Sequence, residues 1–241
     1  MDIFESWLVN NTILKYGMVT PEEPENTIGA FDGAIKINAP ILICVQSLDD
    51  ENLVCFSYKN ISKITNGTGY VQTLSLNEVE NLKVKNTKYN VLSFEKALKH
   101  INGQVPVLIN IFNDGVVGKM ESNILKELRN YKGEFAVMST NPYVLEWFKN
   151  NANDVLRGIK SGKFNDKYYG SIKTKKLTKL KFNKICEPDF IVYNFEDLPN
   201  KYVNKWNVLP IIAYGVTNES EYLSVVKHCD NVICDGFIPE I

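Results

Sequence analysis

The feature that most constrains the fold is a repeated alternation of short apolar runs with amphipathic segments. The apolar runs are unbroken and rich in valine and isoleucine, which is typical of parallel strands covered on both faces. Between them lie segments with apolar residues at helical spacing. The predicted strands are residues 12–14, 41–45, 105–111, 134–138, 155–159, 190–193, 208–213 and 231–234, and the predicted helices are 27–37, 94–101, 122–128, 143–148 and 219–226.

This alternation predicts the fold class. Strands and helices alternating over 241 residues indicate an α/β protein with a (β/α)8 TIM barrel, in a single domain over residues 1–241. A doubly wound sheet is the structural alternative. One segment departs from the rhythm, because only the polar residues 49–52 separate the second strand from another apolar run at 53–56. Four residues are too few for a crossover helix, and we therefore expect the two runs to form an antiparallel hairpin. The hairpin belongs to a small insertion after strand 2, at about residues 47–90.

Charge and hydropathy restrict the partners and the location. The 27 lysine and arginine residues nearly balance the 28 aspartate and glutamate residues, which argues against broad electrostatic binding of nucleic acid or of an anionic membrane surface. No apolar run is long enough to span a membrane, and the start of the chain lacks the pattern of a secretory signal. The five cysteines are odd in number and mostly lie in apolar runs, so we expect reduced thiols and a cytoplasmic protein.

The chain has only two histidines, His100 and His228. Histidine is the side chain whose ordinary pKa suits proton transfer near neutrality. Both histidines fall at the ends of predicted helices that precede a strand. Because active sites of TIM barrels lie at the carboxyl ends of the strands, we expect both to lie away from any site.

Several motifs, in order, resemble the glycerophosphodiester phosphodiesterase family. Pro24-Glu25-Asn26-Thr27 resembles the start of that family's first helix. The hairpin with residues 65–69 looks like its insertion, and residues 91–98, 139–142 and 232–239 resemble later segments of its barrel. The resemblance implies a TIM barrel of a phosphoric diester hydrolase family that acts in glycerophosphodiester and lipid metabolism.

The resemblance also implies where the acid–base groups of the family would lie. Its His-Arg-Gly triplet at the end of strand one aligns with Lys15-Tyr16-Gly17, so only the glycine is kept. Its second histidine and the aspartate that follows align with Ser57 and Tyr58. No catalytic residue of the family is therefore retained at these positions.

The family's metal and phosphate ligands are replaced in the same alignment. Its two metal-binding acids on strand two align with Leu42 and Cys44. Its glutamate and phosphate-binding lysine on strand three align with Asn110 and Phe112. We therefore expect no metal site and no cofactor.

These replacements predict a catalytically inactive family member, a pseudoenzyme repurposed to bind a ligand or a partner. Whether it is an enzyme stays open, because a divergent and metal-independent phosphodiester hydrolase with Lys15, Tyr58 and Glu25 as substitute groups is the alternative. A protein with a filled barrel and a purely interacting surface is a third reading. The expected ligand is a small anionic or glycerophosphodiester-like molecule. The candidate pocket comprises Lys15, Tyr16, Glu25, Cys44, Ser57, Tyr58, Asn110, Phe112, Asn194 and Tyr214.

A second basic feature lies outside this pocket. Lysines occur at positions 173, 175, 176, 179, 181 and 184. A solvated loop or helix face is one interpretation of this run, and local binding to a phosphate-bearing partner is the other.

Overall fold

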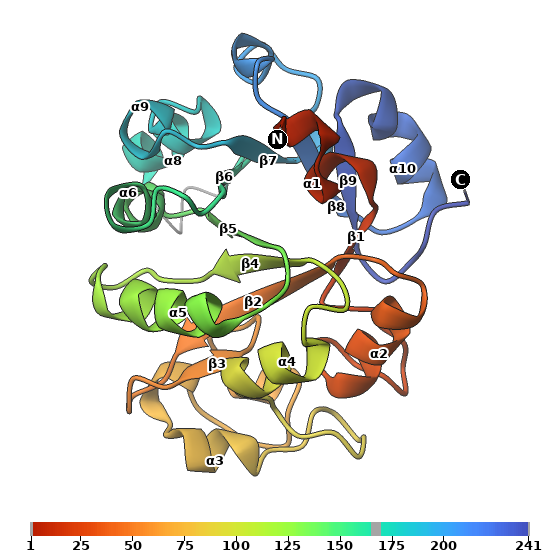
Figure 1. Cartoon of the computed structure of the whole chain (residues 1–241), viewed down its shortest axis with the longest axis vertical. Helices are drawn as coiled ribbons and strands as arrows, with labels where there is room; N and C mark the ends of the chain where they lie inside the picture. Colours follow the sequence, from red (N-terminus) through yellow and green to blue (C-terminus); the bar gives the residue numbers. More distant parts are fainter. Residues whose placement is uncertain (1, 165–169, 241) are drawn as a thin grey trace. The chain divides into compact units, whose positions relative to one another are not determined.

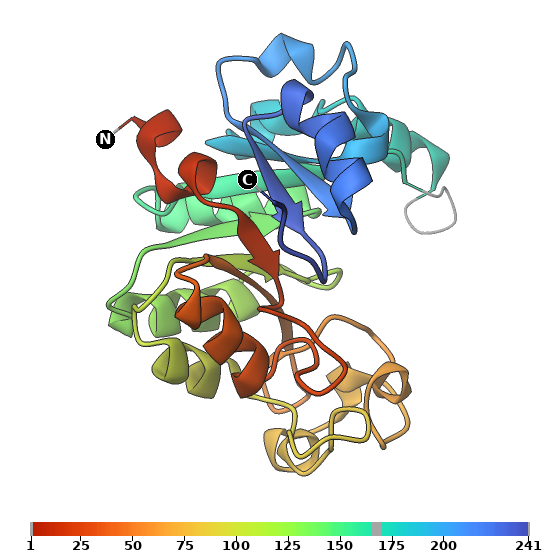
Figure 2. The ribbon, with the colours of Figure 1, turned by 90° about the vertical axis from the view of Figure 1, so that its right-hand side faces the viewer.

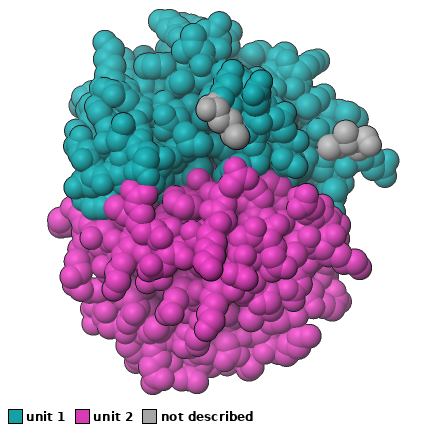
Figure 3. Space-filling model, in the orientation of Figure 1, with its two compact units in different colours: residues 1–13, 136–241 teal, residues 14–135 magenta. Residues whose placement is uncertain are grey.

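A computed structural model describes residues 2–164 and 170–240 of the chain. The chain has two compact units, which Figure 3 shows in different colours. Unit 1 comprises residues 1–13 and 136–241, and unit 2 comprises residues 14–135. That the whole chain forms a single domain stays a prediction.

The strand order confirms the predicted TIM barrel. In the described residues, eight strands neighbour one another in chain order, with β1 also paired to β2, and β3 lies outside this series as a ninth strand (Figure 1). A doubly wound sheet would reverse its strand order at a switch point, and this sheet does not. The strands are β1 (Ile13–Lys15), β2 (Ile41–Ser47), β3 (Leu53–Cys55), β4 (Val107–Ile111), β5 (Phe135–Ser139), β6 (Arg157–Ser161), β7 (Phe190–Asn194), β8 (Ile211–Val216) and β9 (Asn231–Cys234).

The helices follow the strands as the barrel topology requires. The α-helices are α1 (Trp7–Asn10), α2 (Ile28–Lys36), α3 (Leu76–Glu80), α4 (Phe94–Ile101), α5 (Lys119–Asn130), α6 (Pro142–Asn151), α8 (Ser171–Thr178), α9 (Asn183–Cys186) and α10 (Glu219–Val225). The 3-10 helices are η1 (Ile3–Glu5), η2 (Ile61–Lys63), η3 (Val71–Thr73), η4 (Phe195–Asp197), η5 (Asn204–Trp206) and η6 (Val226–His228).

The sheet of unit 2 is centred on β2. This strand pairs in parallel with β1 and β4, and antiparallel with β3, which confirms the predicted hairpin. All five residues of β4 and six of the seven in β2 are buried, as expected for a strand covered on both faces. The register places Cys44 of β2 opposite Asn110 of β4.

Short polar side chains fix where the helices of unit 2 begin. The Thr27 hydroxyl accepts a hydrogen bond from the backbone N–H of Ala30 and so caps α2. Ser93 caps α4 in the same way. The buried Glu121 carboxylate accepts the backbone N–H of Gly118, so α5 begins three residues before the predicted helix.

The insertion after β2 has a hydrophobic cluster of its own. Figure 2 shows its turns and short helices, in orange and yellow, gathered into one compact part of unit 2. The antiparallel strand β3 supplies one wall of the cluster, and α3 and the loops supply the rest. The buried members are Leu48, Val54, Phe56, Ile61, Ile64, Val71, Val79, Val84 and Val91.

Unit 1 contains a parallel sheet in which β6 pairs with β5 and β7, and β8 pairs with β7 and β9. One of its hydrophobic clusters joins this sheet to α6 and α9 through Leu145, Ile191 and Cys186. Asn231 of β9 donates hydrogen bonds from its amide nitrogen to the carbonyls of Leu8 and Asn11, which hold α1 against the end of the sheet.

Two predicted strands in unit 1 had wrong boundaries. The strand predicted at 155–159 begins at the polar Arg157, whose backbone N–H bonds to the Asp189 carboxylate, and it runs on to Ser161. The strand predicted at 208–213 begins only after Pro210, because Val208 is 74% exposed and lies in the preceding loop. Hydropathy alone favoured the apolar residues in both cases.

Candidate functional site

The chain turns sharply where β1 ends. Lys15 is the last residue of the strand, and its ammonium lies 4.9 Å from the ring centroid of Tyr16. Tyr16 has a φ of 67° and Gly17 a φ of 92°. A Cβ on Gly17 would lie 2.5 Å from the carbonyl oxygen of Ala30, so this position requires glycine. The one residue kept from the family's triplet is therefore the residue that packing demands.

The Glu25-Asn26 pair lies beside the end of the hairpin. The Asn26 amide donates to the Ser57 hydroxyl at 3.0 Å, and the Tyr58 hydroxyl donates to the Glu25 carboxylate at 3.2 Å. Asn26 is buried and has a φ of 54°, a conformation that asparagine tolerates better than most residues. The structure thus brings Glu25, Ser57 and Tyr58 together, and that they line a pocket stays a prediction.

The electrostatics of Glu25 favour its neutral form. Burial raises the pKa of this carboxyl above its ordinary value, and this outweighs hydrogen bonds from Ser57 and Tyr58 and the attraction of Lys15 and Lys85. A carboxyl with a raised pKa beside a tyrosine hydroxyl can accept or release a proton closer to neutrality than an ordinary glutamate.

Cys44 and Asn110 contact each other across β2 and β4. The Asn110 amide nitrogen lies 3.6 Å from the Cys44 sulfur and donates to it. Both side chains are buried, with exposed fractions of 2% and 8%. Two of the three positions aligned with metal-binding acids of the family thus hold a thiol and an amide that are bonded to each other.

This donor set does not fit the divalent metal that the family resemblance implies. Leu42, two residues before Cys44 and so on the same face of β2, has no donor atom. Asn110 donates its amide nitrogen to Cys44 and offers a cation only one neutral oxygen, that of its amide. Hard divalent cations take several oxygen ligands, usually including carboxylates, and these three residues offer no carboxylate.

Gln46 and Phe112 complete this end of unit 2. The Gln46 amide nitrogen donates to the backbone carbonyls of Phe56 and Tyr58, at 2.8 and 2.9 Å, and so fixes the end of the hairpin. Phe112 follows β4, and the ammonium of Lys59 lies 5.8 Å from its ring centroid. Lys59 also forms an ion pair with Asp114, and this hydrogen bond holds the pKa of the Asp114 carboxyl below its ordinary value.

The two histidines lie at helix ends, as predicted. His100 is in the last turn of α4, and its Nε2 lies 2.6 Å from the Asp32 carboxylate on α2. The chain runs from His100 to the amino end of β4, whereas the pocket residues of unit 2 follow the carboxyl ends of their strands. His228 ends η6 just before β9.

The remaining pocket residues, Asn194 and Tyr214, belong to unit 1. Asn194 ends β7, and its side-chain oxygen accepts the backbone N–H of Glu196. Tyr214 lies on β8, and the ammonium of Lys160 lies 4.5 Å from its ring centroid. Within unit 1, both residues are at carboxyl ends of strands, the end at which TIM barrels hold their sites.

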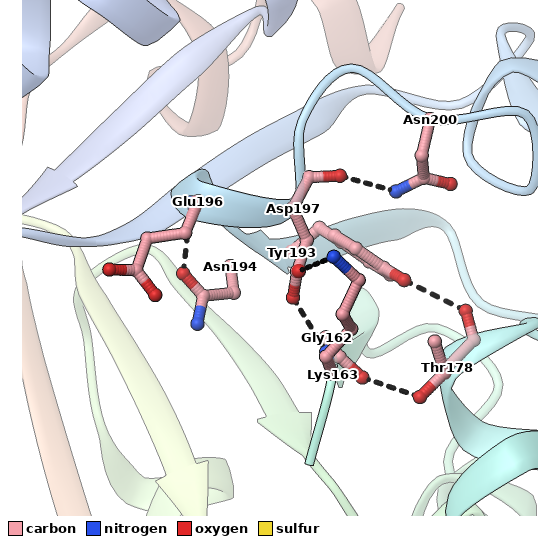
Figure 4. A network of polar contacts seen from close by, with 8 residues as sticks. All are labelled: Gly162, Lys163, Thr178, Tyr193, Asn194, Glu196, Asp197 and Asn200. Atoms are coloured by element: carbon pink, nitrogen blue, oxygen red, sulfur yellow. Dashed lines mark hydrogen bonds and ion pairs between the residues drawn. The ribbon is translucent and has the colours of Figure 1, made fainter.

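A polar network centred on Asp197 fixes the loop after β6 (Figure 4). The Asp197 carboxylate accepts the backbone N–H of Lys163 at 2.6 Å and lies 3.0 Å from its ammonium. Thr178 donates to the Gly162 carbonyl, and Tyr193 donates to the Thr178 carbonyl, each at 2.8 Å. Burial raises the pKa of Tyr193 to about 12, so its hydroxyl stays a donor.

The motifs gave the candidate pocket residues but not several of the residues that contact them in the two units. Lys160, which lies beside Tyr214, was not among the predicted pocket residues, although a polar residue near the carboxyl end of a barrel strand is a signal for it. The role of Asn26 as a donor to Ser57 was missed because the two residues lie 31 positions apart in the chain.

Comparisons with known proteins agree with this fold and these motifs. Residues 19–238 match the Glycerophosphoryl diester phosphodiesterase family. The chain is 23% identical over 214 residues to the YhdW protein of Bacillus subtilis strain 168, whose name places it among the glycerophosphodiester phosphodiesterases, with 81% of this chain and 82% of that protein covered. It is 29% identical over 148 residues to the glycerophosphodiester phosphodiesterase of Caldanaerobacter subterraneus, covering 56% of this chain and 60% of that protein.

A solved structure shares the fold. The Oleispira antarctica phosphodiesterase, solved in complex with its product sn-glycerol-3-phosphate, superposes with a TM-score of 0.81. The superposition covers 95% of this chain and 93% of that chain at 14% sequence identity. None of the helices in residues 2–164 and 170–240 combines the length and the apolar character needed to span a bilayer.

Proposed function

Because the chain belongs to the glycerophosphoryl diester phosphodiesterase family, we propose that it is a catalytically inactive member that binds a small anionic ligand. The observation that supports this most directly is the hydrogen bond between Asn110 and Cys44. These neutral side chains stand where the family resemblance implies two metal-binding acids.

The size of the expected loss in the rate of hydrolysis supports the same proposal. Each positioned acid or base contributes roughly 10²–10⁴ in rate, and a divalent metal adds several kcal/mol of charge stabilisation. Lys15-Tyr16 and Ser57-Tyr58 replace the aligned acid–base residues. Without these groups and the metal, the family's route to hydrolysis loses most of its acceleration.

The side chains of unit 2 can still recognise an anion. Lys15 supplies a positive charge near Glu25, and the hydroxyls of Ser57 and Tyr58, which bond to the Glu25 carboxyl in this structure, are the donors that a bound anion would recruit. The complex of the Oleispira antarctica phosphodiesterase with sn-glycerol-3-phosphate supports a phosphate monoester of this size as the ligand class.

Hydrolysis tests the catalytic part of the proposal. We expect no release of glycerol-3-phosphate from glycerophosphocholine, and no cleavage of bis(p-nitrophenyl) phosphate, with or without added Mg²⁺, Mn²⁺ or Ca²⁺. Divalent-dependent turnover by the pure protein, retained through a final gel-filtration step, would overturn it.

A ligand titration tests the second part of the proposal, that the protein binds a small anion. Titration with sn-glycerol-3-phosphate in a calorimeter should give saturable binding, and Lys15→Gln should weaken it about tenfold or more, since charged hydrogen bonds contribute about 1.5–3 kcal/mol. The matched control is Lys36→Gln, which removes an exposed lysine at the end of α2. Equal affinity of both variants would count against the Lys15 site.

The contact between Tyr58 and Glu25 favours a second candidate function. A carboxyl with a raised pKa, hydrogen-bonded to a hydroxyl and near Lys15, is a plausible acid–base pair for metal-independent phosphodiester hydrolysis. If activity appears in the presence of a chelator, this candidate predicts that Glu25→Gln and Tyr58→Phe each lower kcat at least tenfold. Unchanged kcat in both variants would exclude it.

We also propose a cytoplasmic location. It is supported by the five cysteines, all of which are free thiols in this structure, because secreted proteins commonly oxidise their cysteines to disulfides. Fractionation of the cells that express the protein tests this location.

A further inference from the structure

One face of unit 1 concentrates positive charge in a chain that is otherwise acidic. Residues 170–186 contain six lysines and no aspartate or glutamate. Six of the 27 lysine and arginine residues therefore lie in this segment. The rest of the chain holds the other 21 together with all 28 aspartate and glutamate residues, so it carries a net negative charge. The next acids along the chain, Glu187 and Asp189, form ion pairs with Lys149 and Arg157.

Helix α8 orders this charge on one side. Thr174 and Leu177 are buried and fix the inner face of the helix. Residues Ile172, Lys175, Lys176 and Lys179 follow the i, i+3, i+4, i+7 spacing of a single helical face, and all four are exposed. Figure 1 shows α8 beside α9, which carries the exposed Lys184.

A further lysine from a distant segment joins this face. Two ammonium groups lie near the ring of Tyr202, that of Lys179 at 5.7 Å and that of Lys201 at 5.5 Å from the ring centroid. Because Lys201 is in the loop after η4 and Lys179 caps α8, the fold itself brings these charges together. Ile172, at the start of the helix, is 72% exposed, which is unusual for so large an apolar side chain.

We propose that this basic face, formed by Ile172, Lys175, Lys176, Lys179 and Lys201, docks unit 1 on an anionic lipid surface. Each lysine close to such a surface raises the partition of the protein about fivefold. Ile172 enters the boundary between headgroups and acyl chains. The net negative charge of the rest of the chain is repelled by the same surface, so the face also sets the orientation.

The chemistry of this face favours lipid over nucleic acid. All of its cations are lysines, which act as compact point charges, whereas recognition of bases and paired phosphate oxygens favours arginine. Ile172 offers no ring on which a base could stack, and two ammonium groups already lie near the ring of Tyr202.

Vesicle flotation tests the proposal with the full chain. We expect binding to phosphatidylcholine vesicles that contain phosphatidylserine and none to phosphatidylcholine alone, and we expect it to weaken as salt rises. The triple variant Lys175→Gln, Lys176→Gln, Lys179→Gln should lower the partition coefficient about 10²-fold. The triple change of the same residues to arginine should retain binding, and Ile172→Ser should weaken it severalfold.

The matched control removes three exposed lysines from helices of unit 2, with Lys36→Gln, Lys99→Gln and Lys126→Gln. It has the same net charge as the test variant and should bind vesicles nearly as well as the parent protein. The proposal is overturned if the control triple variant loses as much binding as the Lys175, Lys176 and Lys179 to glutamine variant, or if the parent protein does not bind vesicles that contain phosphatidylserine. It is also overturned if single-stranded RNA displaces the protein completely from the vesicles and this displacement requires the three lysines. Thermal unfolding of every variant confirms that each is folded.

Discussion

Gly17 shows how a single residue can be dictated by packing and not by chemistry. Its φ of 92° and the nearby carbonyl of Ala30 both exclude a side chain. A glycine shared with an enzyme family is thus no argument for shared catalysis. Lys15 and Tyr16, which precede it, differ from the residues of the family triplet with which they align.

Substitution at Gly17 separates steric overlap from backbone conformation. Gly69 has a similar φ of 105° but open space around its Cβ position. We expect Gly69→Ala to lower the free energy of unfolding by about 1–2 kcal/mol, and Gly17→Ala to lower it by about 1–3 kcal/mol more. Urea denaturation of the two variants measures the difference between their free energies of unfolding. Equal losses of stability would show that the backbone at Ala30 can move away from the added methyl group without a cost.

Glu25 predicts a dependence of stability on pH. Because burial raises its folded-state pKa above 4.5, the folded chain holds this proton more firmly than the unfolded chain. Its ionisation therefore lowers the free energy of unfolding as pH rises from 4.5 through the folded-state pKa. Glu25→Gln removes this loss, so the variant should gain stability relative to the parent over that range.

Urea unfolding at several pH values, from below 4.5 to neutrality, checks the Glu25 prediction. The exposed Glu134 provides the control, since Glu134→Gln should shift the free energy of unfolding by a nearly constant small amount. A stability difference between Glu25→Gln and the parent that does not change with pH would contradict the prediction.

At the scale of elements, the Asp197 network explains how a polar loop is held in place. One carboxylate of η4 binds both the backbone and the side chain of Lys163. The same loop is joined to the end of α8 through Gly162 and Thr178. The basic face on α8 is therefore anchored to the sheet of unit 1 by hydrogen bonds at its carboxyl end.

Removal of the Asp197 carboxylate should loosen this loop. The Asp197 side chain is only 7% exposed, so Asp197→Ala leaves the Lys163 N–H without its partner. We expect a loss of about 2–3 kcal/mol in the free energy of unfolding, and faster amide exchange at Lys163. Glu196→Ala, on the neighbouring exposed residue, should stay within about 0.5 kcal/mol of the parent. Similar effects of both changes would refute the role of the network.

The limits of a strand could be predicted where one continuous run of apolar residues defined it. The strands β2, β4 and β7 lie in unbroken apolar runs, and each was placed correctly at one end and within two residues at the other, whereas β6 and β8 were displaced at both ends. The limits of β6 and β8 were wrong because Arg157 is buried by a polar partner while Val208 is exposed. Side-chain partners such as Ser57 for Asn26 depend on contacts 31 residues apart, which local patterns do not encode.

For the whole molecule, the ordered motifs predicted the barrel and its family, because they occur at intervals from residue 24 to residue 239. The chemistry of the site could be predicted only as a set of replaced positions. The bond between Asn110 and Cys44 emerges from the register of β2 and β4, which the sequence motifs do not specify.

The five cysteines offer a test of the folded molecule as a whole. Burial raises the pKa of the Cys186, Cys229 and Cys234 thiols to about 12, and it raises that of Cys55 further. Since the thiolate is the reactive form, Ellman's reagent at neutral pH should label the native protein slowly and label all five thiols at once in urea.

Cys229 is the most accessible of the five. It should therefore account for the fastest native labelling phase, and Cys229→Ser should remove that phase while Cys234→Ser leaves it in place. A native thiol other than Cys229 that reacts as fast as free cysteine would contradict this assignment.

The bond between Cys44 and Asn110 has a consequence for evolutionary reversal. A carboxylate introduced at either position alone would be a buried charge beside a neutral partner, at a cost of several kcal/mol. Because the two side chains touch, the effects of changing them are coupled and not additive. Each single step back toward an acidic pair therefore passes through a less stable protein. The contact between Cys44 and Asn110 therefore opposes the stepwise introduction of carboxylates at these two positions.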